Sequence, residues 1–135
     1  MAFELIQIIE DEPEHAHLID HALRYALYQT NIAYDGATGL GEVKRLGPAL
    51  VVLDVMLPEF NGYEVCRLLR KTPETSRIPI LMISALGLQT HRTAALALGA
   101  DEYLTKPFSL RELVRRVRVL LERDHGKQFT NETPR

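Results

Sequence analysis

The fold is most readable in one stretch of the chain, Leu50-Val51-Val52-Leu53-Asp54-Val55-Met56-Leu57-Pro58. Its first four residues are apolar and mostly branched, which is typical of a strand covered on both faces, as in a parallel sheet. The acidic Asp54 follows at the expected carboxyl end of that strand. We therefore take residues 50–53 as a central strand.

Four more short apolar runs fall at residues 5–9, 31–34, 80–83 and 102–104. The segments between them carry apolar residues at helical spacing, as in Ala16, Ile19, Leu23 and Ala26. Strands alternating with helices predict a parallel sheet with right-handed crossovers and helices on both faces. The runs at 31–34 and 102–104 are assigned mainly because they complete this alternation.

The last helix begins with capping-box spacing, Ser109 followed by Glu112, and has a continuous apolar stripe. After Asp124 the stripe stops and the chain becomes polar, with Gly126 and Pro134. We expect one domain over residues 1–124 and a polar tail or the start of a linker over residues 125–135.

Composition fits a single globular domain, since 46% of the 135 residues are apolar and 25% are charged. Sixteen basic and eighteen acidic side chains give a net charge of −2, which argues against direct nucleic-acid binding by this domain. The single cysteine, Cys66, allows no internal disulfide and suits a reducing cytosol. The longest apolar stretch, residues 49–57, is far shorter than the ~20 residues that span a bilayer, so we expect a cytoplasmic protein without membrane contact.

Polar side chains stand where four of the predicted strands end. The first strand is followed by Glu10-Asp11-Glu12, the third by Asp54, the fourth by Ser84 and the fifth, after Thr105, by Lys106. In a doubly wound sheet, ligands bind in the crevice beyond the carboxyl ends of the strands. We therefore expect these carboxylates, the hydroxyl and the ammonium to converge on one site.

Such a cluster predicts a particular chemistry. Packed carboxylates repel one another, and a bound cation relieves that repulsion. Mg²⁺ prefers oxygen ligands such as carboxylates, a backbone carbonyl and water. It would align an incoming phosphoryl group with a carboxylate nucleophile, while Lys106 and Ser84 would contact the phosphoryl oxygens.

Four strings of the chain together resemble the receiver domains of response regulators in bacterial two-component signalling. They are Ile8-Ile9-Glu10-Asp11-Glu12-Pro13, residues 51–58 with Gly62 following, Met82-Ile83-Ser84-Ala85, and Tyr103-Leu104-Thr105-Lys106-Pro107-Phe108. The resemblance covers residues 3–124 in the family's order and spacing. It implies a flavodoxin-like, three-layer α/β sandwich with a five-stranded parallel sheet in the order 2-1-3-4-5.

The resemblance also implies roles for individual residues. Asp54 would accept a phosphoryl group from a phosphohistidine on a sensor histidine kinase or a phosphotransfer protein. Asp11, Asp54 and the backbone carbonyl of Met56 would bind Mg²⁺, and Glu10 would act through water. Position 10 is Glu where many members have Asp.

The phosphoryl group itself would be contacted by Ser84 and Lys106, and the Lys106–Pro107 peptide would be cis. Ser84 stands where many members have Thr. Tyr103 would be the aromatic switch that turns inward when the Ser84 hydroxyl moves toward the phosphoryl group. Met56 and Leu86 would be the apolar side chains that limit the access of water to the phosphorylated aspartate.

A partner surface is implied by the same resemblance. The expected face is formed by the fourth helix, the fifth strand and the fifth helix, and it resembles the dimer face of regulators that carry winged-helix DNA-binding domains. Its charged residues are Arg92, Glu102, Glu112, Arg116 and Arg118. The fourth helix, expected at 90–98, has Ala94 and Ala97 where that branch places charges, so homodimerisation through this face is a hypothesis.

Other interpretations stay open. Haloacid-dehalogenase-type phosphatases also use an aspartate after an apolar strand, but they need a second acid two residues later, where this chain has Met56. A degenerate receiver could serve as a phosphorylation-independent docking module, although the full set of acids, hydroxyl and lysine argues against this. His15, His17 and His21 suggest a metal site, but without ligands at fitting spacing we expect a solvated helix face.

Overall fold

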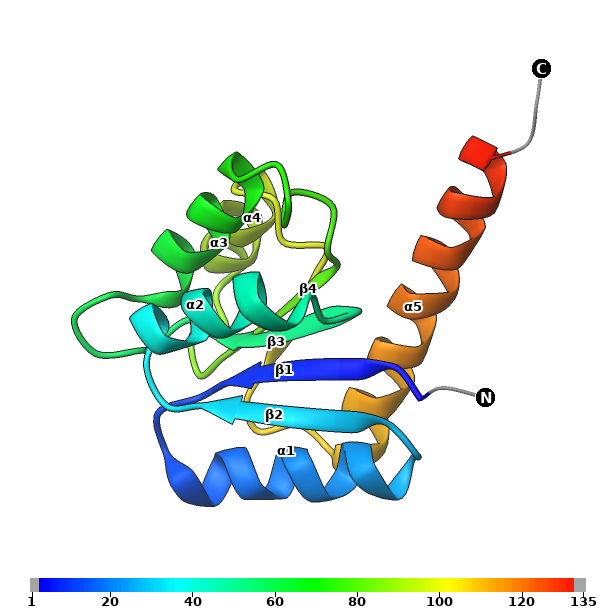
Figure 1. The fold of residues 1–135 in the computed structure, drawn as a ribbon. Helices are drawn as coiled ribbons and strands as arrows, with labels where there is room; N and C mark the ends of the chain where they lie inside the picture. Colours follow the sequence, from blue (N-terminus) through cyan, green and yellow to red (C-terminus); the bar gives the residue numbers. More distant parts are fainter. Residues whose placement is uncertain (1–2, 133–135) are drawn as a thin grey trace.

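The computed structural model describes residues 3–132 and contains a five-stranded parallel sheet in the order β2-β1-β3-β4-β5. The elements alternate along the chain, as the sequence predicts (Figure 1). Their bounds are β1 Leu5–Ile9, α1 Pro13–Tyr25, β2 Gln29–Ala33, α2 Gly36–Leu46, β3 Leu50–Asp54, α3 Gly62–Lys71, β4 Ile80–Ser84, α4 Gln89–Ala97, β5 Glu102–Thr105 and α5 Leu110–Glu132. The predicted fold class and strand order are confirmed.

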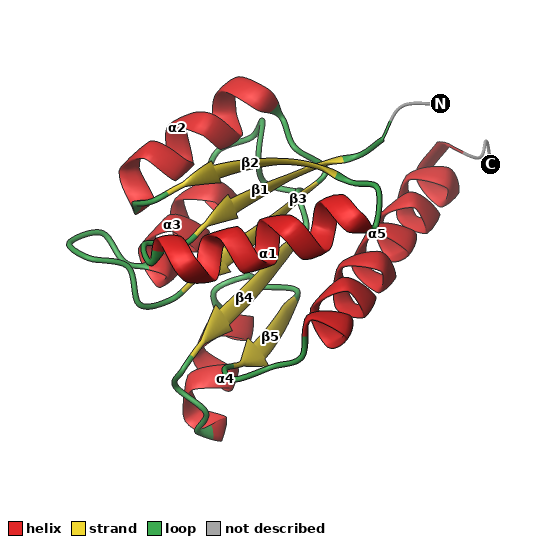
Figure 2. Cartoon of the chain, turned by 90° about the horizontal axis from the view of Figure 1, so that it is seen from below, coloured by secondary structure: helices red, strands yellow, loops and turns green. Residues whose placement is uncertain are grey.

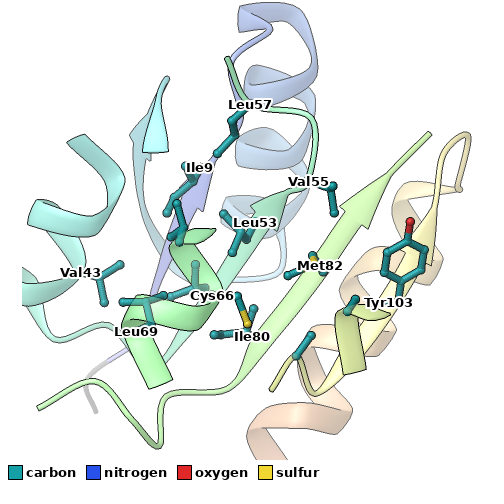
Figure 3. Close-up of a cluster of buried hydrophobic side chains, with 14 residues drawn as sticks. Ile9, Val43, Leu53, Val55, Leu57, Cys66, Leu69, Ile80, Met82 and Tyr103 are labelled. Atoms are coloured by element: carbon teal, nitrogen blue, oxygen red, sulfur yellow. The ribbon is translucent and has the colours of Figure 1, made fainter. Parts of the chain in front are cut away.

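The helices cover the sheet in two layers. Helices α1 and α5 lie on one face, and α2, α3 and α4 lie on the other (Figures 1 and 2). The central strand β3 is buried on both sides because its side chains alternate between the two layers. Val51 and Leu53 pack with α2 and α3, and Leu50 and Val52 pack with α1 and α5. Figure 3 shows the first of these apolar clusters.

The strand register brings the carboxyl ends of the strands to one edge of the sheet. Ile9 of β1 is opposite Leu53 of β3, Asp54 is opposite Ile83 of β4, and Ser84 is opposite Thr105 of β5. The residues that follow these strands therefore start from neighbouring points. This alignment is what positions the candidate site.

The loop between β3 and α3 is fixed by a close backbone contact at Gly62. The Gly62 N–H donates to the carbonyl of Val55 at 2.9 Å. A Cβ atom at this position would lie only 2.3 Å from the Asp54 carbonyl oxygen, so only glycine fits. Next to it, Asn61 and Glu64 form a capping box at the start of α3.

Two elements, β2 and α5, differ from the sequence-based expectation. Strand β2 begins at Gln29 rather than residue 31, because an edge strand with one neighbour tolerates polar residues. Ser109 caps α5 by accepting from the Glu112 N–H at 3.0 Å, but the Glu112 carboxylate pairs with Arg115 and Arg116 instead of closing a capping box. Helix α5 continues to Glu132, so the polar segment after residue 124 extends the helix, and the domain boundary remains a prediction.

Within residues 3–132, no helix combines the length and the apolar character that a membrane crossing needs.

Candidate functional site

Three carboxylates gather beyond the carboxyl ends of β1 and β3. Carboxylate oxygens of Glu10, Asp11 and Asp54 all lie within 4.8 Å of one another. Glu10 is fully buried, Asp54 is 2% exposed, and Asp11 is half-buried. The strand ends thus bring the predicted acids together, and Asp11 and Asp54 line the cavity described below.

Lys106 enters this group from the loop after β5. Its Nζ atom donates to Glu10 Oε1 at 2.9 Å and to Asp54 Oδ2 at 3.2 Å. The backbone N–H of Lys106 donates to the carbonyl of Ser84 at 2.7 Å, which ties the ends of β4 and β5 together. The Lys106–Pro107 peptide is cis, as the family resemblance implies.

Burial, together with the excess of carboxylates over ammonium groups, sets the protonation of the cluster. Burial raises the pKa of Glu10 to about 7, and the charge of Asp54 adds to the rise while the Lys106 hydrogen bond opposes it. Burial by itself lowers the pKa of Lys106, but the hydrogen bond to Glu10 and the attraction of Asp54 outweigh it, so the net direction is upward. Lys106 therefore stays charged, and the site as a whole is short of positive charge.

The carboxylate of Asp54 faces an open cavity of about 660 Å³. Its Oδ1 atom accepts from the Met56 N–H at 3.0 Å, and the Met56 side chain, 54% exposed, lines the cavity. The further lining residues are Asp11, Glu12, His15, Leu18, Ile19, Ala85, Lys106, Pro107, Phe108 and Leu110. A small anionic group from solvent can therefore reach Asp54.

Ser84, Leu86 and Tyr103 are linked by two hydrogen bonds. The Ser84 hydroxyl oxygen accepts from the Leu86 N–H at 3.0 Å, and the Tyr103 hydroxyl donates to the Leu86 carbonyl. Tyr103 is 1% exposed, so its ring already lies inward in this structure. Leu86 is partly buried against the cluster of Figure 3 and does not line the cavity around Asp54.

His15 lies in the site although the sequence pattern places it on a solvated helix face. Its Nδ1 atom is 3.3 Å from Lys106 Nζ and 3.2 Å from Glu12 Oε1. His17 and His21 are exposed on the same helix, so for them the expectation holds. The histidine spacing contains no signal that separates His15 from the other two, because its place depends on how α1 packs.

Four of the five charged residues predicted for the partner face lie together. Arg92 and Arg116 both pair with Glu102 at 3.1 Å, and Arg116 also pairs with Glu112 at 2.6 Å. These ion pairs lie within the chain. Arg118 lies apart from them, in a groove between α1 and α5.

Residues 6–118 match the family model described as the response regulator receiver domain. The chain therefore belongs to the family of receiver domains of response regulators, which are signalling modules rather than enzymes in their own right.

Curated relatives are transcriptional regulators. The chain is 42% identical over 118 residues to the DNA-binding dual master transcriptional regulator RpaA of Synechocystis, an alignment covering 87% of this chain and 49% of RpaA. It is 44% identical over 137 aligned positions to a probable transcriptional regulatory protein of Picosynechococcus, covering 96% of this chain and 53% of that protein. The chain thus spans about half the length of the curated relatives it matches.

A solved structure adds a comparison of the site. The chain is 30% identical to the receiver domain of the sensor histidine kinase PA1611 from Pseudomonas aeruginosa, with a TM-score of 0.83, covering 90% of this chain and 99% of that one. That domain holds a magnesium ion in its active-site cleft. The oxygen donors of Glu10, Asp11 and Asp54 fit the same kind of hard cation.

Proposed function

We propose that this chain is a phosphoacceptor switch in which Asp54 takes a phosphoryl group from a phosphohistidine on a sensor histidine kinase or phosphotransfer protein. The observation that carries the proposal is the placement of the Asp54 carboxylate, which opens onto a cavity yet touches the Lys106 ammonium at 3.2 Å. Family membership supports a kinase partner, and the buried thiol of Cys66 is compatible with a cytoplasmic location.

The chemistry follows from charge. An Asp54 oxygen attacks phosphorus, the bond from phosphorus to the imidazole nitrogen breaks, and the imidazole leaves with the electron pair of that bond and takes up a proton. Mg²⁺ held by Asp11, Asp54 and the Met56 carbonyl, with Glu10 acting through water, would supply the positive charge that lets two anions meet. Lys106 then hydrogen-bonds a phosphoryl oxygen and stabilises the transition state.

The hydrogen bonds of Ser84 suggest how the new charge is read. If the Ser84 hydroxyl turns toward the phosphoryl group, its hydrogen bond from the Leu86 N–H breaks. The loop after β4 is then free to move, and with it the Leu86 carbonyl that accepts from Tyr103. We infer that Ser84 and Tyr103 bias the face formed by α4, β5 and α5 between two states.

The first experiment is acetyl phosphate labelling with Mg²⁺, followed by Phos-tag electrophoresis of the wild-type chain and the Asp54→Ala variant. The proposal expects a shifted band that requires both Mg²⁺ and Asp54. No modification of the wild-type chain would support a docking module instead, and turnover of phosphate esters would support a phosphatase. Labelling of Asp54→Ala equal to the wild type would overturn the assignment of Asp54.

Homodimerisation through the α4–β5–α5 face is the second part of the proposal. Arg92, Glu102, Glu112 and Arg116 already pair within the chain, so a dimer requires these ion pairs to exchange between copies. Sedimentation of the beryllofluoride-treated chain tests it: a shift to a dimer is expected, and a species that stays monomeric would contradict it.

A further inference from the structure

The Lys106 ammonium has three acceptors around it, and the third is the imidazole of His15. The first two are Glu10 and Asp54, at 2.9 and 3.2 Å, and His15 Nδ1 lies 3.3 Å away. His15 is in the first turn of α1, so this contact joins α1 to the loop after β5. An ammonium has three hydrogens, and the three contacts together use all of them.

The contact specifies the tautomer of the ring. An ammonium can only donate, so Nδ1 of His15 must offer its lone pair, and the ring hydrogen is on Nε2. Nδ1 cannot then also donate to Glu12 Oε1, which is 3.2 Å away. The Lys106 contact is favoured because the Lys106 side chain is only 17% exposed and needs a protein acceptor, whereas the Glu12 side chain is 61% exposed and can bind water.

A metal ion is a poor alternative occupant. Glu10, Glu12 and His15 present ligand atoms within 4.8 Å of one another. The Lys106 ammonium, however, lies against two of these three residues. A cation there would compete with Lys106 for both Glu10 and the His15 nitrogen, and a nitrogen ligand does not suit the oxygen-seeking Mg²⁺ proposed for the neighbouring acids.

We propose that His15 is a positioning residue that holds Lys106 in place for phosphoryl transfer; this rests on the proposed function of Asp54. When phosphorus bonds to Asp54, Lys106 exchanges its contact with that carboxylate for one with a phosphoryl oxygen. The contacts with Glu10 and His15 come from other elements and persist through the exchange. The ammonium is therefore oriented before the donor arrives and needs little reorganisation.

This role has a kinetic signature that separates it from a steric one. Lys106 stabilises the same kind of transition state in phosphorylation and in hydrolysis, so a loosened Lys106 slows both reactions. A histidine that only narrowed the cavity would act oppositely, because a smaller residue would admit the donor and water faster. The side chain of His15 is 44% exposed, so we expect a moderate effect.

The test compares His15→Ala with His15→Asn, in which the amide oxygen occupies the place of Nδ1. We expect His15→Ala to lower the rates of acetyl phosphate labelling and of hydrolysis about three- to ten-fold, and His15→Asn to restore most of both. A purely structural role predicts the reverse order, since alanine is the better helix former. His21→Ala, an exposed histidine on the same helix, is the control and should match the wild type.

A readout without phosphate keeps the two proposals apart. The ¹⁵Nζ resonance of Lys106 should broaden or shift in His15→Ala, owing to faster hydrogen exchange, and return toward the wild-type position in His15→Asn. If the wild type accepts phosphate but His15→Asn is no better than His15→Ala, or if His15→Ala is faster, the role of His15 is overturned while Asp54 stands. If the wild type accepts no phosphate, the proposed function of Asp54 fails and the role of His15 in phosphoryl transfer fails with it, while a Lys106 resonance that still responds to His15 would show that the contact itself exists.

Discussion

The Lys106 ammonium donates to the Asp54 carboxylate at 3.2 Å, although the two residues are 52 positions apart in the sequence. The contact joins the ends of β3 and β5, which are separated in the sheet by β4. The loop after β5 reaches across β4 because the Lys106 N–H is fixed to the Ser84 carbonyl. The proposed nucleophile and its cation are thus positioned by backbone geometry.

Replacing Lys106 by methionine should lower the rate of labelling by acetyl phosphate about a hundredfold, the usual effect of removing one preorganised donor. The reason is that no other side chain described here brings a positive charge into contact with Asp54. Initial rates from Phos-tag gels measure this. Lys44→Met, which removes an exposed lysine from α2, should leave the rate unchanged; equal rates in both variants would contradict the role of Lys106.

Magnesium should stabilise the fold by relieving repulsion among the acids. At a concentration about ten times its Kd, Mg²⁺ should raise the melting temperature by roughly 3–6 °C over the value in EDTA. Asp11→Asn should lose most of that increase, because one carboxylate of the proposed site is gone. The control is Glu14→Gln, an exposed acid in the first turn of α1. An Asp11→Asn variant with the full wild-type increase would refute this site.

Met56 should protect the phosphorylated aspartate from water. Its half-exposed side chain lines the cavity, so Met56→Gln should shorten the lifetime of the phosphorylated form severalfold. Decay of the shifted band after removal of acetyl phosphate measures the lifetime. Leu96→Gln, an exposed change on α4 outside the cavity lining, is the control. An unchanged or longer lifetime for Met56→Gln would count against the role.

Two glycines should respond in opposite directions to alanine. At Gly62 a Cβ would lie 2.3 Å from the Asp54 carbonyl oxygen, so Gly62→Ala should lower the free energy of unfolding by about 1–3 kcal/mol. At Gly41, within α2, a Cβ would meet no atom within 4 Å, and Gly41→Ala should raise it by about 0.5–1 kcal/mol. Urea titrations give both values, and a stabilised Gly62→Ala would disprove the close contact.

Cys66 should be inert in the native chain. It is fully buried, and burial raises the pKa of its thiol to about 11. Because the pKa is raised, the thiol stays protonated, and is therefore a poor nucleophile, at pH values well below about 11. Reaction with a thiol-specific dye at pH 8 should be slow in buffer and complete in guanidinium chloride. Fast labelling of the folded chain would show that the cluster around Cys66 opens.

Much of the site could be predicted from sequence because strand ends are easy to locate. Once residues 50–53 and 80–83 are strands of one parallel sheet, Asp54 and Ser84 must lie at the same edge. The Tyr103 side chain illustrates the limit. The strand pattern indicates that it is buried, but its bond to the Leu86 carbonyl depends on the path of an irregular loop.

Helix rotation accounts for most of what the sequence could not predict. His15 and Arg118 each lie on a helix whose sequence pattern identifies the buried apolar face. The pattern does not show which other element lies next to the residues at the border of that face, and both residues are at such positions. The end of α5 is a similar case. A polar segment with a glycine is a weak helix signal by itself, yet a helix already formed extends at low cost, since nucleation is the expensive step.

The burial of β3 on both faces has a mechanical consequence. Its five residues are held between two neighbouring strands and two helical layers, so the strand is a rigid support for Asp54. Phosphorylation would replace the single negative charge of the Asp54 carboxylate with about two on the acyl phosphate, a net gain of about one negative charge at the tip of this rigid element. Because the strand is packed on every side, we expect the structural change caused by that charge to occur in the loops that follow the strands at this edge of the sheet.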